Sequence, residues 1–424
     1  MKKTDKMKME AKAKLLPNKS INSNLDLTYD KNIGRDFKIL FAGDISFAEN
    51  YVLEYSSRKN IGFNIFERYG YDYFFQKLKP LLLESDLVIA NLETPLIDVK
   101  NTVKPTFSFS SRYNKKQGRF QHWSDKTKTV EYLKKYNILN VSLANNHMMD
   151  YGIDGLNQTL DILKESGIRF LGAGVNRRQA GKPYTKNIFI GNKMVKLAVI
   201  SAFEYRKGYD KDFSFYASDR KGGVNRLSIN RIHRKIEKLR EDHGNNIFVV
   251  VLPHWGGARN YGMKTDKQTE VGHQLVNAGA DIVIGSGPHN FQQIDEYKGR
   301  LILYSIANFL YNSLGNYDNY NASPFSLAVR LVFQLNDRGC LTNKPEQDNA
   351  DNDISLPEVK KTIKIYPIMT DNIITKWQAR LLEEQEFKIA QDLLMHKNSF
   401  LKSSKRYPKA GIDKIGRYME LKLD

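Results

Sequence analysis

Cysteine, long apolar runs and acidic residues are all scarce in this chain of 424 residues. Cys340 is the single cysteine, which excludes an intramolecular disulfide and any zinc site built on cysteines. No apolar run reaches the ~18 residues that a membrane-spanning helix needs. Acidic residues number 47 against 66 lysines and arginines, so the formal net charge is +19. The chain is still 41% hydrophobic, which is too much for a wholly disordered protein.

The excess positive charge lies largely at the two ends of the chain. Residues 1–20 carry seven lysines against two acidic residues, and residues 397–424 carry eight basic residues against three acidic ones. We therefore expect a flexible basic tail over 1–35 and a second basic tail over 397–424. Such tails are either solvated or contact an anionic polymer or an acidic membrane surface.

The start of the chain and its motif content bear on location and partners. Residues 1–14 have the charged beginning of a signal peptide but no apolar stretch after it. With no membrane-spanning run either, the sequence favours a cytoplasmic protein or one held peripherally at the membrane. No helix-turn-helix, zinc-finger or RNA-binding pattern is present, so nucleic acid is not expected as a partner.

Short apolar runs alternate with helix-like segments between the two tails. This alternation over 37–310 predicts an α/β fold with central β-sheets flanked by helices. We expect one domain over 36–312, followed by strands and a helix over 313–396 that pack on it. The predicted strands lie at 37–46, 86–96, 138–147, 247–256, 281–290 and 301–310, and the predicted helices include 74–85, 154–167, 231–242 and 374–394.

Polar side chains follow five of the predicted strands at the point where each one ends. Ligands of open α/β sheets collect beyond the carboxyl ends of the strands, so we expect these side chains to meet at one edge of a sheet. Each residue alone is more often structural, as a turn residue, a cap or a half-buried ring. Carboxylate, amide and imidazole together suit Zn²⁺, Mn²⁺ or Fe, whereas Ca²⁺ would take oxygen ligands only. The residues are Asp44, Glu93, Asn145-Asn146-His147, His254 and His289.

The remaining histidines lie in predicted loops or on helix faces, and we expect them to be structural. They are His122, His233, His243, His273 and His396.

Eight short strings carry a resemblance to a known family. In order along the chain they resemble the CapA capsule-synthesis family, which is associated with poly-γ-glutamate and is similar to the calcineurin-like metallophosphoesterases. The similarity spans about residues 36–312 and implies a layered metallophosphoesterase-like fold with its site at the carboxyl ends of the strands. The strings are GD (43–44), NLETPL (91–96), SLANNHMMDYG (142–152), GLNQTL (155–160), GAG (172–174), PHWG (253–256), GADIVIGSGPHNFQ (279–292) and YSIANF (304–309).

The resemblance also implies a role for each residue of the constellation. Asp44 and His289 would hold one divalent metal, and Glu93 would bridge it to a second. Asn146 and His254 would hold that second ion. The cofactor would therefore be one or two ions of Mn, Fe or Zn. Two metals ~3.5–4 Å apart supply a water nucleophile and offset charge on a phosphoryl group.

Two further residues take catalytic roles by the same resemblance. His147 would donate a proton to the leaving oxygen, and Asp150 would orient the His147 ring.

Two departures from the family pattern leave two functions open. Gly287 stands where the family has the first histidine of a G-x-H-P-H loop, and Ala258 stands where a glutamate follows HWG. Glycine offers no ligand, so the second metal site is expected to be weak. One function is a metal-dependent hydrolase of a phosphoester or related bond in cell-envelope polymer metabolism. The other is a non-catalytic accessory protein that binds poly-γ-glutamate or the capsule synthesis complex, with peripheral membrane contact through the basic tails.

Overall fold

The structure is a computed structural model, and it describes the chain with gaps. The described residues are 36–49, 64–98, 122–244, 246–257, 261–312, 317, 320–335, 359–398 and 407–423. The predicted tail over 1–35, Ala258 and Cys340 lie outside them. None of the described helices combines the length and hydrophobicity that crossing a bilayer requires.

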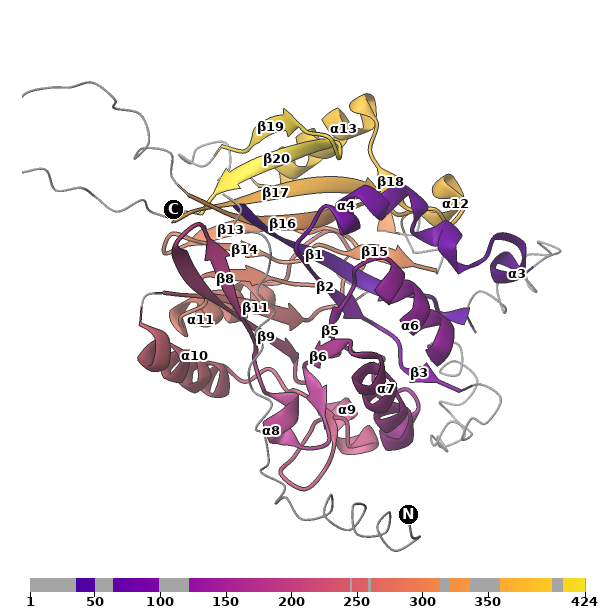
Figure 1. The fold of residues 1–424 in the computed structure, drawn as a ribbon, viewed down its shortest axis with the longest axis vertical. Helices are drawn as coiled ribbons and strands as arrows, with labels where there is room; N and C mark the ends of the chain where they lie inside the picture. The colour runs from indigo at the N-terminus through magenta and orange to yellow at the C-terminus, as the bar shows by residue number, and fades with distance from the viewer. Residues whose placement is uncertain are drawn as a thin grey trace, which may run out of the picture. The chain divides into compact units, whose positions relative to one another are not determined.

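Two β-sheets form the centre of the fold (Figure 1). The larger has the strand order β19-β20-β17-β16-β1-β2-β5-β6, with β15 paired to β1 and β18 paired to β17. The smaller has the order β13-β14-β12-β11-β9-β8. The strands of the larger sheet are β1 (Asp36–Ser46), β2 (Leu87–Leu92), β5 (Asn140–Ser142), β6 (Arg169–Leu171), β15 (Asn308–Tyr311), β16 (Phe325–Leu335), β17 (Val359–Met369), β18 (Arg380–Leu381), β19 (Lys409–Ile412) and β20 (Arg417–Lys422).

The smaller sheet, two pairs of short strands and the helices complete the described elements. The smaller sheet consists of β8 (Tyr184–Ile190), β9 (Lys193–Phe203), β11 (Ile247–His254), β12 (Ile282–Ile284), β13 (Ile294–Tyr297) and β14 (Arg300–Leu303). Two further pairs are β3 (Leu96–Ile97) with β4 (Ser124–Asp125), and β7 (Ala173–Gly174) with β10 (Gly223–Val224). The helices are α3 (Ile65–Tyr69), η1 (Tyr71–Phe74), η2 (Gln76–Leu78), α4 (Lys79–Leu83), α6 (Lys126–Lys135), α7 (Gly152–Ser166), α8 (Arg177–Ala180), α9 (Lys207–Phe213), α10 (Ile229–His243), α11 (Asp266–Asn277), α12 (Asn372–Thr375) and α13 (Glu384–Lys397).

Alternation of side chains along the strands builds the layers of the fold. Ile39 and Phe41 of β1 enter a core shared with Val250 of β11, so the two sheets pack face to face. Leu40 points to the opposite face and shares a second core with Leu156 of α7. On the far side of the smaller sheet, a third core joins residues of β11 to α10 and α11. The layers are therefore helices, sheet, sheet and helices, which confirms the predicted α/β class and is consistent with a layered metallophosphoesterase-like fold.

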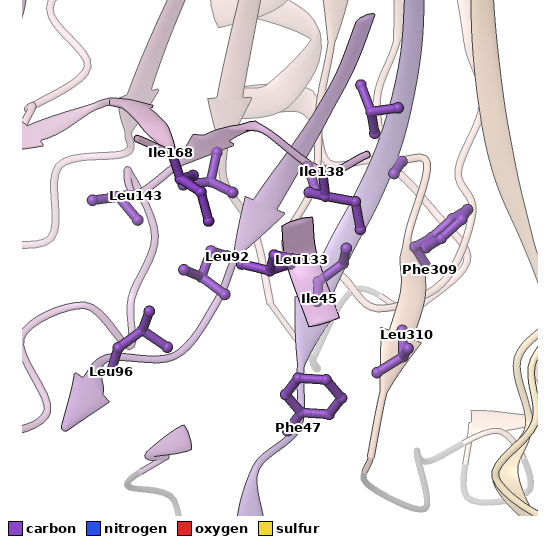
Figure 2. Close-up of a cluster of buried hydrophobic side chains, with 14 of the residues drawn as sticks. Ile45, Phe47, Leu92, Leu96, Leu133, Ile138, Leu143, Ile168, Phe309 and Leu310 are labelled. Atoms are coloured by element: carbon purple, nitrogen blue, oxygen red, sulfur yellow. The ribbon is translucent and has the colours of Figure 1, made fainter. Parts of the chain in front are cut away.

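The core between the larger sheet and its helices holds the carboxyl ends of β1 and β2 (Figure 2). Ile45 and Leu92 lie side by side in this core, with Leu133 of α6 beside them. Phe47 is fully buried among four aromatic rings at centroid distances of 5.0–6.4 Å. Packing of this density fixes the strand ends, and the polar residues beside them are fixed as a result.

The predicted strand 301–310 is wrong, because the chain changes sheets within it. Residues of β14 pair in the smaller sheet, whereas β15 pairs with β1 in the larger one. The crossing lies at Ser305–Ala307, and Ala307 takes a positive φ of 64°. All residues of the run are apolar or buried, so the sequence pattern carries no sign of the change.

Two predictions for the last part of the chain also differ from the structure. The predicted helix 374–394 is interrupted at Lys376 and Trp377, whose φ angles are 53° and 62°, so that only α12 and α13 are helical. The predicted basic tail over 397–424 contains β19 and β20, and β20 pairs with β17. Met419 and Leu421 are buried at alternate positions of β20, which is the period of a strand in a sheet. The domain boundary at residue 312 stays a prediction.

Glu49 generates a prediction about the pH dependence of folding. It is buried, and its Oε1 accepts hydrogen bonds from the Tyr71 hydroxyl and the Asp125 amide, both at 2.9 Å. Burial raises the pKa of its carboxyl from about 4.5 to about 7. Between these values the folded protein binds more protons than the unfolded chain, so the free energy of unfolding falls as pH rises.

As pH rises, we expect the free energy of unfolding of Glu49→Gln to fall by up to about 3 kcal/mol less than that of the wild type. The reason is that the glutamine amide oxygen accepts the same hydrogen bonds and does not ionise. Urea unfolding of both proteins at several pH values between 4.5 and 8 measures it. Parallel stability profiles for the two proteins would contradict the assignment.

Candidate metal centre

Asp44 reaches the site because Gly43 lets two backbone segments approach closely. Gly43 has a φ of 82°, and a Cβ at this position would lie 2.3 Å from the Ala307 carbonyl oxygen. The Asp44 amide donates to that same oxygen at 3.0 Å. The Asp44 carboxylate is fully buried and accepts a 2.8 Å hydrogen bond from the Asn91 amide. The GD string thus places a carboxylate where β1 meets the crossing into β15.

His289 faces Asp44 and Glu93 from the loop after β12. Its Nδ1 lies 3.6 Å from Asp44 Oδ2, and its Nε2 lies 3.7 Å from Glu93 Oε1. The Asn308 amide oxygen, 2.9 Å from Nδ1, orients the ring. His289 takes a φ of 57°, an uncommon backbone conformation of the kind that concentrates at functional sites. One ligand atom from each of Asp44, Glu93 and His289 falls within 4.8 Å of the others.

His254 also faces Glu93, and it contacts Asn146. His254 Nε2 is 3.8 Å from Glu93 Oε1 and 2.7 Å from Asn146 Oδ1. Its Nδ1 is 2.9 Å from the Ser286 hydroxyl, which fixes the ring. The imidazole therefore contacts the Asn146 amide oxygen as well as facing the Glu93 carboxylate.

His147 and Asp150 form a contiguous pair at the edge of the site. His147 Nδ1 lies 2.7 Å from Asp150 Oδ2, and its Nε2 lies 3.8 Å from Glu93 Oε1. The His122 amide donates to the same Asp150 oxygen at 2.7 Å. The His122 ring stacks on the His147 ring at a centroid distance of 3.8 Å. Asp150 and His122 together hold the His147 imidazole so that one nitrogen faces the carboxylates.

The residues predicted from sequence do come together, but not at one edge of one sheet. Asp44, Glu93 and Asn146 follow strands of the larger sheet, whereas His254 and His289 follow strands of the smaller one. The site therefore lies where the carboxyl ends of the two packed sheets meet. Asn145 turns away to donate hydrogen bonds to the Leu92 carbonyl at 2.8 Å and to Asn91 Oδ1 at 3.1 Å, so it orders the loop instead of facing the carboxylates.

Burial dominates the electrostatics of the centre. It raises the pKa of the Asp44 and Glu93 carboxyls, and the charge of Asp44 raises that of Glu93 further. Burial also lowers the pKa of His254 well below its usual range and that of His147 to about 3. Both imidazoles are therefore neutral at neutral pH, and each ring carries one N–H and one nitrogen with a lone pair. Burial raises the pKa of Asp150 to about 8, so the Asp150–His147 contact holds one shared proton at neutral pH.

The donor set fits a divalent cation. Asp44 Oδ2 and both carboxylate oxygens of Glu93 are buried and have no hydrogen-bond partner among the described residues. A buried carboxylate without a partner is costly unless a cation offsets its charge. Neutral imidazole beside carboxylate oxygen is the ligand combination of Zn²⁺, Mn²⁺ or Fe sites.

Gly287 offers no side-chain ligand atom on the His254 side of the centre. Its φ is 114°, and a Cβ there would lie 2.5 Å from the Trp255 carbonyl oxygen and 3.2 Å from His254 Nε2. The loop conformation is thus one that glycine adopts and that a histidine side chain would disrupt. The hydroxyl of the neighbouring Ser286 lies 2.9 Å from His254 Nδ1, the ring nitrogen that does not face Glu93.

Several residues of the site escaped the sequence analysis. His122 was expected to be structural and instead stacks on His147, and no motif around it marks that position. Asn91 and Asn308 lie within quoted strings, so a signal for them existed without an assigned role. Sequence reasoning found the groups that face the carboxylates and missed those that orient them.

Comparison with known proteins agrees with the sequence resemblance. The family model of the bacterial capsule synthesis protein PGA_cap matches residues 38–313. The capsule biosynthesis protein CapA of Bacillus anthracis is 34% identical over 255 residues, covering 58% of this chain and 56% of that protein. The PGA biosynthesis protein CapA of Bacillus subtilis is 28% identical over 246 residues, covering 58% of each. The chain thus matches a little over half the length of these two curated relatives.

A solved structure entitled GAP50, the anchor in the inner membrane complex of Plasmodium, aligns with 85% of this chain and 95% of its own. Its 10% identity and TM-score of 0.31 are too low to bear on the fold.

The variant Glu93→Gln tests whether the buried carboxylates form a cation-binding site. In metal-free protein at pH 8 we expect the variant to be more stable than the wild type by about 1 kcal/mol or more, because a neutral amide avoids the cost of either burying the charge or protonating the carboxyl. Added Mn²⁺ should raise the melting temperature of the wild type and leave that of the variant unchanged.

Glu237→Gln on α10 is the matched control, since Glu237 is exposed. It should behave as the wild type in both measurements. A Glu93→Gln protein that is less stable without metal, or still stabilised by Mn²⁺, would refute the interpretation.

Proposed function

Because the chain belongs to the bacterial capsule synthesis protein PGA_cap family, we propose that it acts in capsule polymer synthesis as a metal-dependent hydrolase. Its substrate would be a phosphoester or a related bond of an envelope polymer. The observation that carries the proposal is the set of three buried carboxylate oxygens of Asp44 and Glu93, unpartnered beside neutral imidazoles.

The geometry supports one strong cation site and one weak one. Asp44, Glu93 and His289 would hold the first ion, since their ligand atoms already lie within 4.8 Å of one another. Asn146 and His254 would hold the second with Glu93, but they contact each other at 2.7 Å, and Gly287 adds no ligand. A bound divalent cation would polarise the substrate's phosphoryl oxygen and offset its charge.

His147 would move the proton. Its Nε2 faces Glu93 at 3.8 Å, so it borders the place where the reacting group would lie. The neutral ring carries one N–H, and it would give that proton from Nε2 to the leaving oxygen while Nδ1 takes the proton shared with Asp150. Asp150 is a positioning residue in this scheme, because its 2.7 Å contact with Nδ1 fixes the ring and the position of the shared proton. The His122 ring limits tilting of the imidazole from one face.

The second candidate is a non-catalytic accessory protein that binds an anionic polymer or the capsule synthesis complex. The Gly287 loop favours it, because the centre lacks a side chain where a second strong ligand would lie. Such a protein would keep one cation in a structural role and would not catalyse hydrolysis.

Hydrolysis of a chromogenic phosphodiester in the presence of Mn²⁺ separates the two candidates. If the protein is a hydrolase, the wild type hydrolyses the phosphodiester, and His147→Asn lowers the turnover rate by at least about 100-fold. The variant should still be stabilised by Mn²⁺. His273→Asn, which changes a ring stacked on Tyr297 of the smaller sheet, is the matched control and should keep full activity. A wild type that is stabilised by Mn²⁺ without turnover would overturn the hydrolase and favour the accessory protein.

A further inference from the structure

We propose that His254 is a hydrogen-bond donor and not a metal ligand, and that its Nε2–H group binds a phosphoryl oxygen of the substrate beside a single cation. The inference rests on the proposed function and adds the group that would bind the substrate on this side of the centre. A chain of hydrogen bonds that begins at the backbone determines which nitrogen of the His254 ring carries the proton.

The backbone fixes the orientation of the Asn145 side chain. Its Oδ1 accepts hydrogen bonds from the amides of His147 and Met148, both at 3.1 Å. Its Nδ2 donates to the Leu92 carbonyl at 2.8 Å. Backbone amides only donate and a carbonyl only accepts, so exchanging the oxygen and nitrogen of this side chain would break all three hydrogen bonds.

Asn145 in turn fixes the orientation of Asn91. Asn145 Nδ2 donates to Asn91 Oδ1 at 3.1 Å, so the Asn91 oxygen faces Asn145. The Asn91 NH₂ group therefore faces the metal centre, where its nitrogen lies 2.8 Å from Asp44 Oδ1 and 3.2 Å from His254 Nδ1. This nitrogen carries two hydrogens and accepts no hydrogen bond, so it donates one hydrogen to the carboxylate and the other to the imidazole.

The Asn91 donor determines the tautomer of His254. Because Nδ1 accepts a hydrogen bond it carries no proton, and the neutral ring has its N–H on Nε2. This N–H donates to Asn146 Oδ1 at 2.7 Å, and the same nitrogen lies 3.8 Å from Glu93 Oε1. A protonated ring nitrogen has no lone pair, so His254 offers no ligand atom to a cation beside Glu93 in this arrangement.

His289 has the opposite tautomer. Its Nδ1 lies 2.9 Å from the Asn308 amide oxygen and 3.6 Å from Asp44 Oδ2, and both of these oxygens are acceptors. Nδ1 therefore carries the N–H, which leaves a lone pair on Nε2, 3.7 Å from Glu93 Oε1. A histidine that ligates a metal through one nitrogen usually donates from the other, as His289 does. The centre would thus hold one cation, between Asp44, Glu93 and His289.

An N–H group beside a cation site suits an anionic oxygen. The partly exposed Asn146 places its amide oxygen against this N–H, and its side chain would turn aside for the substrate. Gly287 adds no side chain that would cover Nε2, since a Cβ there would lie 3.2 Å from that nitrogen. A hydrogen bond to a charged oxygen is stronger than one to an amide oxygen, so a phosphoryl group would replace the amide at a net gain.

The number of Mn²⁺ ions bound by the full-length protein tests the tautomer. Equilibrium dialysis at saturating Mn²⁺ should give one ion per chain in the wild type. In Asn91→Asp a carboxylate oxygen accepts from Nδ1, so the ring proton moves to Nδ1, Nε2 gains a lone pair and a second Mn²⁺ should bind. Asn308→Asp is the matched control, because it makes the same change beside His289, whose Nδ1 already carries the proton, and the count should stay at one.

NMR of the ring nitrogens of metal-free wild type keeps the test decisive if Asn91→Asp does not fold. Long-range proton–nitrogen spectra distinguish the two neutral tautomers of histidine. The signals of His254 are those that disappear in His254→Gln. They should show the proton on Nε2.

Inorganic phosphate tests the role of the N–H group. We expect Mn²⁺-loaded His254→Leu to keep its single ion and to bind phosphate at least about tenfold more weakly than the wild type in calorimetry, because it lacks one hydrogen bond to a charged oxygen. His254→Gln retains a donor and should lose less affinity. His273→Leu removes a ring stacked on Tyr297, outside the centre, and should bind phosphate as the wild type does.

Three results would each overturn the inference. They are two Mn²⁺ ions per wild-type chain, a proton on Nδ1 of His254, and unchanged phosphate affinity in His254→Leu. None of these measurements uses turnover. A protein that binds one Mn²⁺ and phosphate without hydrolysis would overturn the hydrolase alone, whereas one that hydrolyses with two Mn²⁺ ions would overturn only the role of His254.

Discussion

Two carboxylates buried side by side without partners are the constraint on which this site depends. Asp44 and Glu93 follow neighbouring parallel strands, β1 and β2, and both are fully shielded from solvent. Nothing among the described residues donates to Asp44 Oδ2 or to either oxygen of Glu93. The imidazoles of His254 and His147 are neutral because the same burial lowers their pKa. The fold therefore holds carboxylate oxygens without hydrogen-bond partners beside neutral imidazoles, a set that fits a divalent cation.

The fold supports this arrangement by bringing the ends of two sheets together. The chain passes from the smaller sheet into the larger one at Ser305–Ala307, and the Ala307 carbonyl accepts from the Asp44 amide. Gly43 and Gly287 each sit where a Cβ would collide with backbone, so both glycines are demanded by close approach. At Gly43 the approach places the Asp44 carboxylate in the site, whereas Gly287 places no side chain there.

The sequence predicted which residues lie together in the site better than how the fold holds them there. Polar residues at the ends of apolar runs are easy to recognise in a sequence. This pattern identified Asp44, Glu93, His254 and His289. Orientation by Asn308, His122 and Ser286 depends on contacts between distant segments, which periodicity does not encode. The switch of sheets within 301–310 was missed because both strands and the crossing are equally buried. The C-terminal strand β20 was missed because Arg417 and Lys422 were counted as part of a basic tail, and this charge outweighed the alternation of Met419 and Leu421.

The metal content of purified variants tests the central claim most directly. The account predicts one tightly held divalent ion per chain in the wild type, lost in Asp44→Asn and retained in Asn146→Ala, because Asp44 and Asn146 serve different halves of the centre. Elemental analysis after dialysis against metal-free buffer measures it. No metal in the wild type, or equal metal in the two variants, would contradict the account.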